Sequence, residues 1–200
     1  CFIIVAFEVP KMKIAKTLLT KNIYGILFNK RNLGSWKKEY SDHKIAGFSM
    51  EQMFEVVSDV ENYATFLPFC QKSIVHTRTE KELLGELQVG FPPVTESYVS
   101  KVTLVRPYLV KADCTDGRLF HHLNTTWRFT KPRLRNAHHF PNSCSVHFYI
   151  SFEFKSLLHS QLANIFFDHL VSQMEAAFFK EAYRRYGAPK WTKSGTDAPT

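Results

Sequence analysis

The last third of the chain constrains the fold most strongly, because an alternating strand pattern is followed at once by a long helical pattern. Residues Cys144–Phe154 alternate between apolar and polar side chains over eleven positions. A period of two over that length predicts an antiparallel strand with one dry face and one wet face. From Leu157 to Tyr186, apolar residues recur at steps of three and four, which predicts one helix about 45 Å long. Such a helix needs a long apolar surface to lie on.

Four further strands are predicted in the middle of the chain. They cover Leu83–Phe91, Glu96–Val105, Tyr108–Cys114 and Leu119–Phe129. Pro92 and Pro93 are expected to end the first of them, because proline cannot donate to a central ladder. The sequence Thr115-Asp116-Gly117 predicts a turn after the third. Residues Lys131–Asn142 are basic and flanked by prolines, which predicts a loop.

The region before these strands predicts one interrupted strand and two short helices. The strand is expected at Trp36–Tyr40 and again at Lys44–Phe48. Ser49 and Gln52 have the spacing of a capping box, in which each side chain satisfies a free N–H at the start of a helix. A second helix is expected over Glu61–Phe66, and Pro68 ends it. The capping-box spacing therefore places the first helix directly after the first strand.

These elements together predict an α+β fold with one curved antiparallel sheet wrapped on a long C-terminal helix. We expect a leader over residues 1–35, a folded domain over 36–188 and a disordered tail over 189–200. The leader is basic and nearly free of acids, and its Ile and Leu residues recur at helical spacing, as in a mitochondrial presequence. An ordinary amphipathic surface helix is the alternative.

The positive charge of the chain is concentrated in this leader. Residues 1–35 hold six basic residues and one acid, a net of +5, so the other 165 residues carry only +3 of the total +8. A nucleic-acid-binding domain usually carries its positive charge in the folded part, so we expect no nucleic-acid partner. No apolar run approaches the roughly 20 residues that a membrane-spanning helix needs.

The sequence carries no recognisable catalytic or metal-binding motif. There is no Gly-x-Ser-x-Gly nucleophile motif, no glycine-rich phosphate loop and no Cys-x-x-Cys pair. We therefore expect no catalytic residue and no metal. His121, on an apolar strand face, and His169, at the edge of the helical stripe, are candidates for a polar contact with a ligand. The alternative for both is a histidine satisfied within or beside the core.

Several sequence stretches resemble the mitochondrial coenzyme Q-binding proteins, which belong to the START-related, polyketide cyclase-like superfamily. The stretches are Ser58–Tyr63, Phe66–Cys70, Val89–Pro93, Cys114–Phe120, Trp127–Phe129 and Ile150–Leu162. The resemblance implies a helix-grip fold of the START/Bet v 1-like kind and a non-enzymatic lipid chaperone that binds ubiquinone. The chain departs from the family at Phe69, where a Trp is usual, and at His169, where an acid is usual.

The resemblance also implies a location and partners. These are peripheral contact with the matrix side of the mitochondrial inner membrane, a role in respiratory electron transport and coenzyme Q biosynthesis, and coenzyme Q biosynthetic or respiratory complexes as further partners. Ubiquinone would be a ligand, with no cofactor. Two other functions remain open, a cyclase-like enzyme of the same fold and a ribosome- or translation-associated interaction protein.

The dry faces supply candidate residues for an apolar tunnel. The expected lining is Leu87, Val89, Leu123, Trp127, Phe129, Phe148, Ile150, Phe152 and Phe154 from the strands, with Leu162, Phe166, Leu170 and Met174 from the helix. A pocket mouth at the membrane is expected at Phe66, Leu67, Pro68 and Phe69 together with Phe91, Pro92 and Pro93. Each lining residue would also serve in an ordinary core, and the mouth segments would also serve as packed turns.

Overall fold

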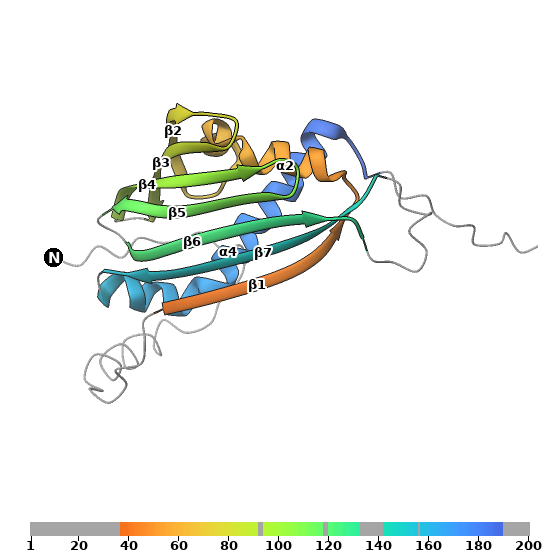
Figure 1. The fold of residues 1–200 in the computed structure, drawn as a ribbon. Coiled ribbons are helices and arrows are strands. Elements are labelled where there is room, and N and C mark those ends of the chain that lie inside the picture. Colours follow the sequence, from red (N-terminus) through yellow and green to blue (C-terminus); the bar gives the residue numbers. More distant parts are fainter. Residues whose placement is uncertain (1–36, 92–93, 118–119, 133–141, 156, 190–200) are drawn as a thin grey trace, which may run out of the picture. The chain divides into compact units, whose positions relative to one another are not determined.

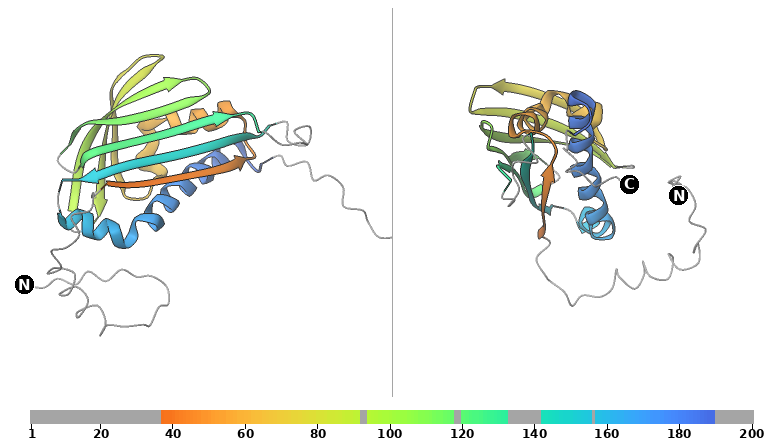
Figure 2. Two further views of the ribbon diagram at one scale, coloured as in Figure 1. Left: turned by 60° about the horizontal axis from the view of Figure 1, so that its bottom comes forward. Right: turned by 90° about the vertical axis from the view of Figure 1, so that its right-hand side faces the viewer.

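A curved antiparallel sheet with one long helix on its concave side forms the domain (Figure 1). The computed structural model describes residues 37–91, 94–117, 120–132, 142–155 and 157–189. Within these ranges seven strands run in the spatial order β1-β7-β6-β5-β4-β3-β2, and every neighbouring pair is antiparallel. The right-hand view of Figure 2 shows the sheet bending around the helix. The predicted α+β helix-grip architecture is confirmed.

The elements follow one another in the predicted order. The strands are β1 Lys37–Ala46, β2 Cys70–Arg78, β3 Glu82–Phe91, β4 Val94–Val105, β5 Leu109–Gly117, β6 Phe120–Thr130 and β7 Cys144–Phe154. The helices are α2 Met50–Ser58, the 3-10 turn η1 Val60–Asn62, α3 Tyr63–Phe66 and α4 Leu157–Tyr186. Strand β2 has no regular apolar alternation, and the sequence pattern does not locate it.

Strand β1 is continuous, so the predicted interruption between Tyr40 and Lys44 is wrong. It pairs with β7 along its whole length, with Asp42 opposite Phe148. The polar residues fit because β1 is an edge strand of the described sheet and because they bind one another. The Asp42 carboxylate lies 2.7 Å from Lys44 Nζ and accepts a hydrogen bond from the Tyr40 hydroxyl at 3.3 Å.

Strand β5 runs through Gly117, so the predicted turn at Thr115-Asp116-Gly117 is also wrong. Val99 of β4 lies opposite Asp116, whereas the next residue, Ser100, lies opposite Cys114. Thr115 is therefore an extra residue, which makes a β-bulge. The turn-forming sequence therefore lies within the strand as a bulge, and the chain does not reverse direction there.

The helix ends match their sequence signals. The Ser49 side chain accepts from the Gln52 N–H at 3.2 Å, and the Gln52 side chain accepts from the Ser49 N–H at 2.9 Å, so the capping box is confirmed. Helix α4 ends as predicted at Gly187, which has φ +79° and donates its N–H to the Tyr183 carbonyl at 2.9 Å. The predicted leader, tail, proline turn and most of Lys131–Asn142 lie outside the described residues, and they stay predictions.

Aromatic rings join α3 and α4 to the centre of the sheet. The Phe178 ring of α4 lies 4.8 Å from Trp127, 5.3 Å from Tyr63 and 5.5 Å from Phe66, measured between ring centroids. Trp127 in turn lies 4.3 Å from Phe148 on the next strand. Such ring pairs contribute roughly 0.5–1.5 kcal/mol each beyond the area they bury. This cluster therefore links α3 and α4 to the sheet.

Candidate functional site

Burial changes along the concave face of the sheet, which gives the domain a closed end and an open end. In β6, Phe129 and Trp127 are buried, whereas Leu123 and Phe120 are only partly buried. The same trend runs through β4, from Leu104 and Val102 to Tyr98, and through β3, from Leu83 to Leu87 and Val89. Register places the partly buried residues side by side, because Tyr98 lies opposite Leu87.

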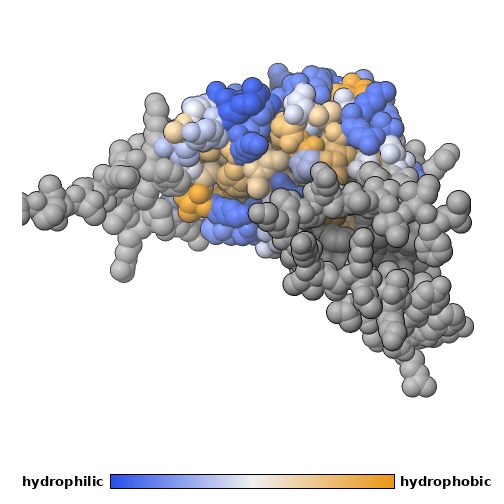
Figure 3. Space-filling view, turned by 180° about the vertical axis from the view of Figure 1, so that it is seen from behind, coloured by the Kyte–Doolittle hydropathy of each residue, from blue (hydrophilic) through white to orange (hydrophobic). Residues whose placement is uncertain are grey.

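Helix α2 explains the closed end. It packs on β5 and β6 and buries Met53, Phe54, Val56 and Val57. The opposite part of the concave face, defined by Leu87, Val89, Tyr98, Phe120 and Leu123, is called the open end below. These side chains face the covered side of the sheet yet keep accessible surface, so the packing over them is incomplete. Figure 3 looks at the helix side and shows apolar surface gathered in a band between polar rims.

The predicted tunnel residues divide between the two ends. Leu87, Val89 and Leu123 lie at the open end, whereas Trp127 and Phe129 lie at the closed end. Phe148, Ile150 and Phe152 are buried along β7. On α4, Leu170 and Met174 are partly buried. The side chains of Phe154, Leu162, Phe166 and His169 lie outside the described residues. Tunnel lining remains a prediction for all of these residues.

Two residues of the open end are absent from the predicted set. Tyr98 and Phe120 contact each other edge to face, with ring centroids 5.4 Å apart, and Phe120 also contacts Phe152 at 6.0 Å. Sequence alternation missed Phe120 because a bulge interrupts β6. Phe120 lies opposite Phe154, whereas His122 lies opposite Glu153, so His121 is the extra residue. The His121 side chain is exposed, and its predicted place on the apolar face is wrong.

The two predicted mouth segments are brought together by β2 and β3. Cys70 pairs with Val89, and the Gly90 N–H donates to the Phe69 carbonyl at 2.8 Å. Phe69 has φ +64°, a left-handed conformation that aromatic residues rarely adopt. Its side chain and that of Pro68 are partly buried. The side chain of Phe91 and the residues Pro92 and Pro93 lie outside the described part.

Phe66 has a structural role beside any role at the mouth. Its ring packs edge to face against Tyr63, at 5.7 Å, and against Phe178. A charge at this position should therefore destabilise the fold as well as change the mouth. Phe66 also borders an open groove between α3 and the last turns of α4, whose other lining includes Asn62, Ala177 and Lys180.

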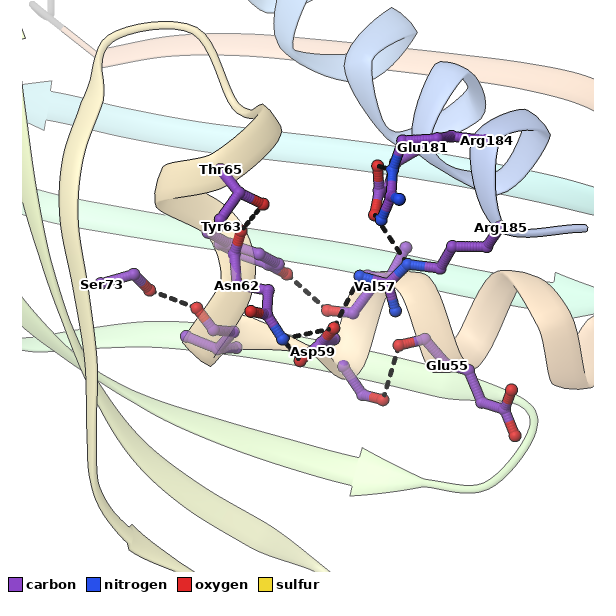
Figure 4. Close-up of polar contacts among 12 residues, drawn as sticks. Glu55, Val57, Asp59, Asn62, Tyr63, Thr65, Ser73, Glu181, Arg184 and Arg185 are labelled. Atoms are coloured by element: carbon purple, nitrogen blue, oxygen red, sulfur yellow. Dashed lines mark hydrogen bonds and ion pairs between the residues drawn. The ribbon is translucent and has the colours of Figure 1, made fainter.

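A charged clamp fixes the end of α4 to the connection between α2 and η1 (Figure 4). Arg185 binds Asp59 at 2.6 Å and Glu181 at 2.7 Å, and Arg184 binds the same Glu181 carboxylate at 2.7 Å. Glu181 is 3% exposed. Hydrogen bonds from Arg184 and then from Arg185 lower its pKa to about 2, against the opposing effect of burial.

A second buried carboxylate fixes α4 to β1. Glu175 is 1% exposed, and its carboxylate lies 2.8 Å from Lys44 Nζ and accepts a hydrogen bond from the Tyr40 hydroxyl at 3.4 Å. Burial raises the pKa of Glu175 despite the lysine. Both buried acids therefore have structural partners.

The described residues hold neither a spanning helix nor a metal cluster. None of their helices combines the length and the apolar character needed to cross a bilayer. The same residues bring no group of three or more metal-ligating side chains together.

Comparison with known proteins identifies the family. Residues 47–179 match the model of the family described as polyketide cyclase / dehydrase and lipid transport. The mitochondrial coenzyme Q-binding protein COQ10 homolog B of Xenopus laevis is 50% identical over 155 residues, which cover 78% of this chain and 62% of the relative. The mitochondrial coenzyme Q-binding protein COQ10 of Drosophila melanogaster is 52% identical over 150 residues, which cover 75% of this chain and 60% of the relative. The chain thus spans about three fifths of each relative.

More distant similarities bear on fold and on alternatives. The ribosome association toxin RatA of Vibrio cholerae is 30% identical over 150 residues, which cover 75% of this chain and 99% of the toxin. The Zhui aromatase/cyclase from Streptomyces sp. R1128 superposes with a TM-score of 0.62 at 14% identity, covering 78% of this chain and 99% of the enzyme. At that identity the similarity concerns the fold alone. The chain belongs to the polyketide cyclase / dehydrase and lipid transport family, in the branch of the coenzyme Q-binding proteins.

Proposed function

We propose that this domain binds ubiquinone at the open end of its concave face and acts as a non-enzymatic lipid chaperone. The observation that carries the proposal is a set of apolar side chains that face the covered side of the sheet and remain accessible, among them Leu87, Phe120 and Leu123. The relatives that are 50% and 52% identical are named for coenzyme Q binding.

The physical chemistry of ubiquinone fits such a site. Its isoprenoid tail is apolar, and transfer from water to an apolar site gains about 25 cal/mol per Å² of buried surface. The incomplete packing at the open end leaves apolar surface for that contact. The closed end, where Trp127 and Phe129 pack against the helices, holds the fold while the open end takes the ligand.

Extraction of the purified protein with organic solvent, followed by chromatography for quinones, tests the proposal. We expect ubiquinone in the extract of the wild-type protein and little in that of Leu123→Arg, which places a charge at the open end. Val105→Arg is the matched control, because Val105 is 47% exposed on the same sheet. Equal quinone content in folded Leu123→Arg and Val105→Arg proteins would contradict the assignment of the site.

We further propose that the paired mouth segments touch the matrix face of the mitochondrial inner membrane. Phe69 provides the test, because Asn tolerates its positive φ whereas most residues do not. Phe69→Asn should reduce co-sedimentation with anionic liposomes, whereas Phe69→Trp, which keeps an aromatic ring, should retain it. Equal liposome binding by both variants would refute this orientation. Delivery of quinone at this membrane would support respiratory electron transport and coenzyme Q biosynthesis. We therefore propose coenzyme Q biosynthetic or respiratory complexes as further partners.

Ribosome association is the second candidate, and the match to RatA over 99% of the toxin favours it. Ribosome co-sedimentation at physiological salt separates the two proposals. Stoichiometric ribosome binding by a protein that yields no quinone on extraction would favour the second candidate. Cyclase-like catalysis has weaker support, because burial raises the pKa of the Tyr98 hydroxyl at the open end, away from the range of a general base.

A further inference from the structure

The open end contains two hydroxyl groups on one strand face. Tyr98 and Ser100 are alternate residues of β4, so both point to the concave side, about 7 Å apart along the strand. The face continues into the core with Val102 and Leu104, which are buried. Tyr98 touches the ring of Phe120 edge to face. An aromatic hydroxyl is thus held in apolar surroundings.

Tyr98 lies opposite Leu87 of β3, two residues from Val89, which pairs with Cys70 at the end of the first mouth segment. Burial raises the pKa of the Tyr98 hydroxyl, with smaller contributions from the thiols of Cys70 and Cys114. Tyr98 likewise contributes to the raised pKa of Tyr63. Tyr63 and Cys70 flank the mouth segment Phe66–Phe69 in the sequence.

Neither hydroxyl has a partner among the described residues. The neighbouring Tyr63 hydroxyl donates to the Val57 carbonyl, and the Tyr186 hydroxyl donates to Glu55 at 2.9 Å. The hydroxyls of Tyr98 and of Ser100, which is 7% exposed, make no hydrogen bond to any described protein group. Ser100 is buried and Tyr98 is partly buried. A hydroxyl withdrawn from water without an acceptor is costly, and such groups commonly mark a place where a ligand or water binds.

We propose that the Tyr98 hydroxyl donates a hydrogen bond to a carbonyl oxygen of the ligand's ring, with Ser100 as the next polar group along the strand. This inference rests on the proposed quinone-binding function and specifies how the ring is recognised. Glu96 occupies the next position toward the mouth on the same face, opposite Val89. Its carboxylate disfavours an anionic head group at this depth. The site therefore fits a neutral ring that carries carbonyl groups on an apolar tail.

Tyr98→Phe tests the inference, because it removes one oxygen and keeps the ring contact with Phe120. Tyr63→Phe is the matched control, since it removes a buried hydroxyl that already has a protein acceptor. Each protein is titrated with a short-tailed ubiquinone and with a tail-matched alkylbenzene that has no carbonyl group. A neutral hydrogen bond corresponds to an affinity loss of roughly 3- to 10-fold, which we expect for the quinone alone and for Tyr98→Phe alone.

Two further measurements distinguish a lost hydrogen bond to the ligand from a loss of protein stability. The infrared carbonyl stretch of bound quinone should lie lower in the wild type and in Tyr63→Phe than in Tyr98→Phe. Without added lipid, Tyr98→Phe should be at least as stable as the wild type, whereas Tyr63→Phe should be less stable. A Tyr98→Phe protein with unchanged quinone affinity and an unchanged carbonyl band would overturn the inference and leave quinone binding intact. A wild-type protein that binds neither lipid would overturn the proposed function, and the inference with it.

Discussion

The two buried carboxylates of α4 should respond to pH in opposite directions. Glu181 and Glu175 lie six positions apart on one helix, and both are almost fully buried. Arginine partners lower the pKa of Glu181, whereas burial raises the pKa of Glu175. We therefore expect Glu181→Gln and Glu175→Gln to change the stability profile with opposite signs, although the two substitutions are chemically identical.

The structure sets the size of the Glu181 effect. Its pKa falls from 4.5 to about 2, and each pKa unit corresponds to about 1.36 kcal/mol, so the ionised group contributes roughly 3 kcal/mol as an upper limit. Arg184 is 70% exposed, and solvent screens its interaction, so we expect about 2 kcal/mol. Because the folded pKa is lowered, this contribution is complete above the unfolded value near 4.5 and is lost as the pH falls toward 2.

The contribution of Glu175 to the free energy of unfolding depends on pH with the opposite sign. Its folded pKa is raised, so ionisation opposes folding as the pH rises above the ordinary value of 4.5. Glu175→Gln should therefore gain stability relative to the wild type between pH 4 and pH 7. Glu175→Gln also loses the ion pair with Lys44, and this loss lowers the free energy of unfolding of the variant by the same amount across that pH range.

Urea unfolding followed by circular dichroism at pH 3, 4, 5 and 7 measures both effects. We expect Glu181→Gln to be about 2 kcal/mol less stable than the wild type at pH 7 and to approach it at pH 3. A loss below about 0.5 kcal/mol at pH 7, with a wild-type pH profile, would refute the reasoning about the clamp. Parallel profiles for the two glutamine variants would refute the reasoning about burial.

Three further predictions concern packing, capping and thiol chemistry. Phe178→Ala should lower the free energy of unfolding by about 4 kcal/mol. Tyr183→Ala on the same helix is the control, because that side chain is 55% exposed, and it should change the free energy of unfolding by less than about 0.5 kcal/mol. Similar values for the two variants would contradict the role of the aromatic cluster. Ser49→Ala should cost about 1 kcal/mol in the same urea assay, because it removes half of the capping box, and an unchanged midpoint would argue against that cap. Burial raises the pKa of the Cys144 thiol to about 12, so mass spectrometry after iodoacetamide treatment at pH 8 should find Cys70 labelled well before Cys144.

Sequence patterns located the elements whose stability is local or regular. Strand β7 has the predicted bounds because its alternation is unbroken, and α4 has the predicted bounds because Gly187 ends it by a local mechanism. The predictions for β1 and β5 are wrong for one reason: turn-forming or polar residues do not end a strand when its neighbour accommodates them. An edge position accommodates Asp42 in β1, which pairs with the distant strand β7, and a bulge accommodates Thr115 in β5, which pairs with the preceding strand β4; both depend on how a neighbouring strand pairs, which a single-strand pattern does not show.

The buried side of α4 could not be predicted for a similar reason. Periodicity favours an apolar stripe, yet Glu175 and Glu181 are buried. Glu175 is paired with Lys44 of β1, which lies more than 100 residues earlier in the chain, whereas Glu181 is paired with Arg184 and Arg185, three and four positions further along α4. A carboxylate is buried only where a cation offsets its loss of water, and helical spacing carries no information about the distant lysine that pairs with Glu175, although it does place Arg184 and Arg185 beside Glu181.

The position of the candidate site follows from how little of the concave face α2 covers. At nine residues, α2 is only about 14 Å long and packs on β5 and β6, while the open end keeps accessible surface. Residues of that uncovered part remain accessible although they are apolar, and apolar surface of this kind marks a binding site when it is concave and rimmed by polar groups. The proposed ligand site therefore depends on where the first helix stops, at Ser58, as well as on the residues that line it.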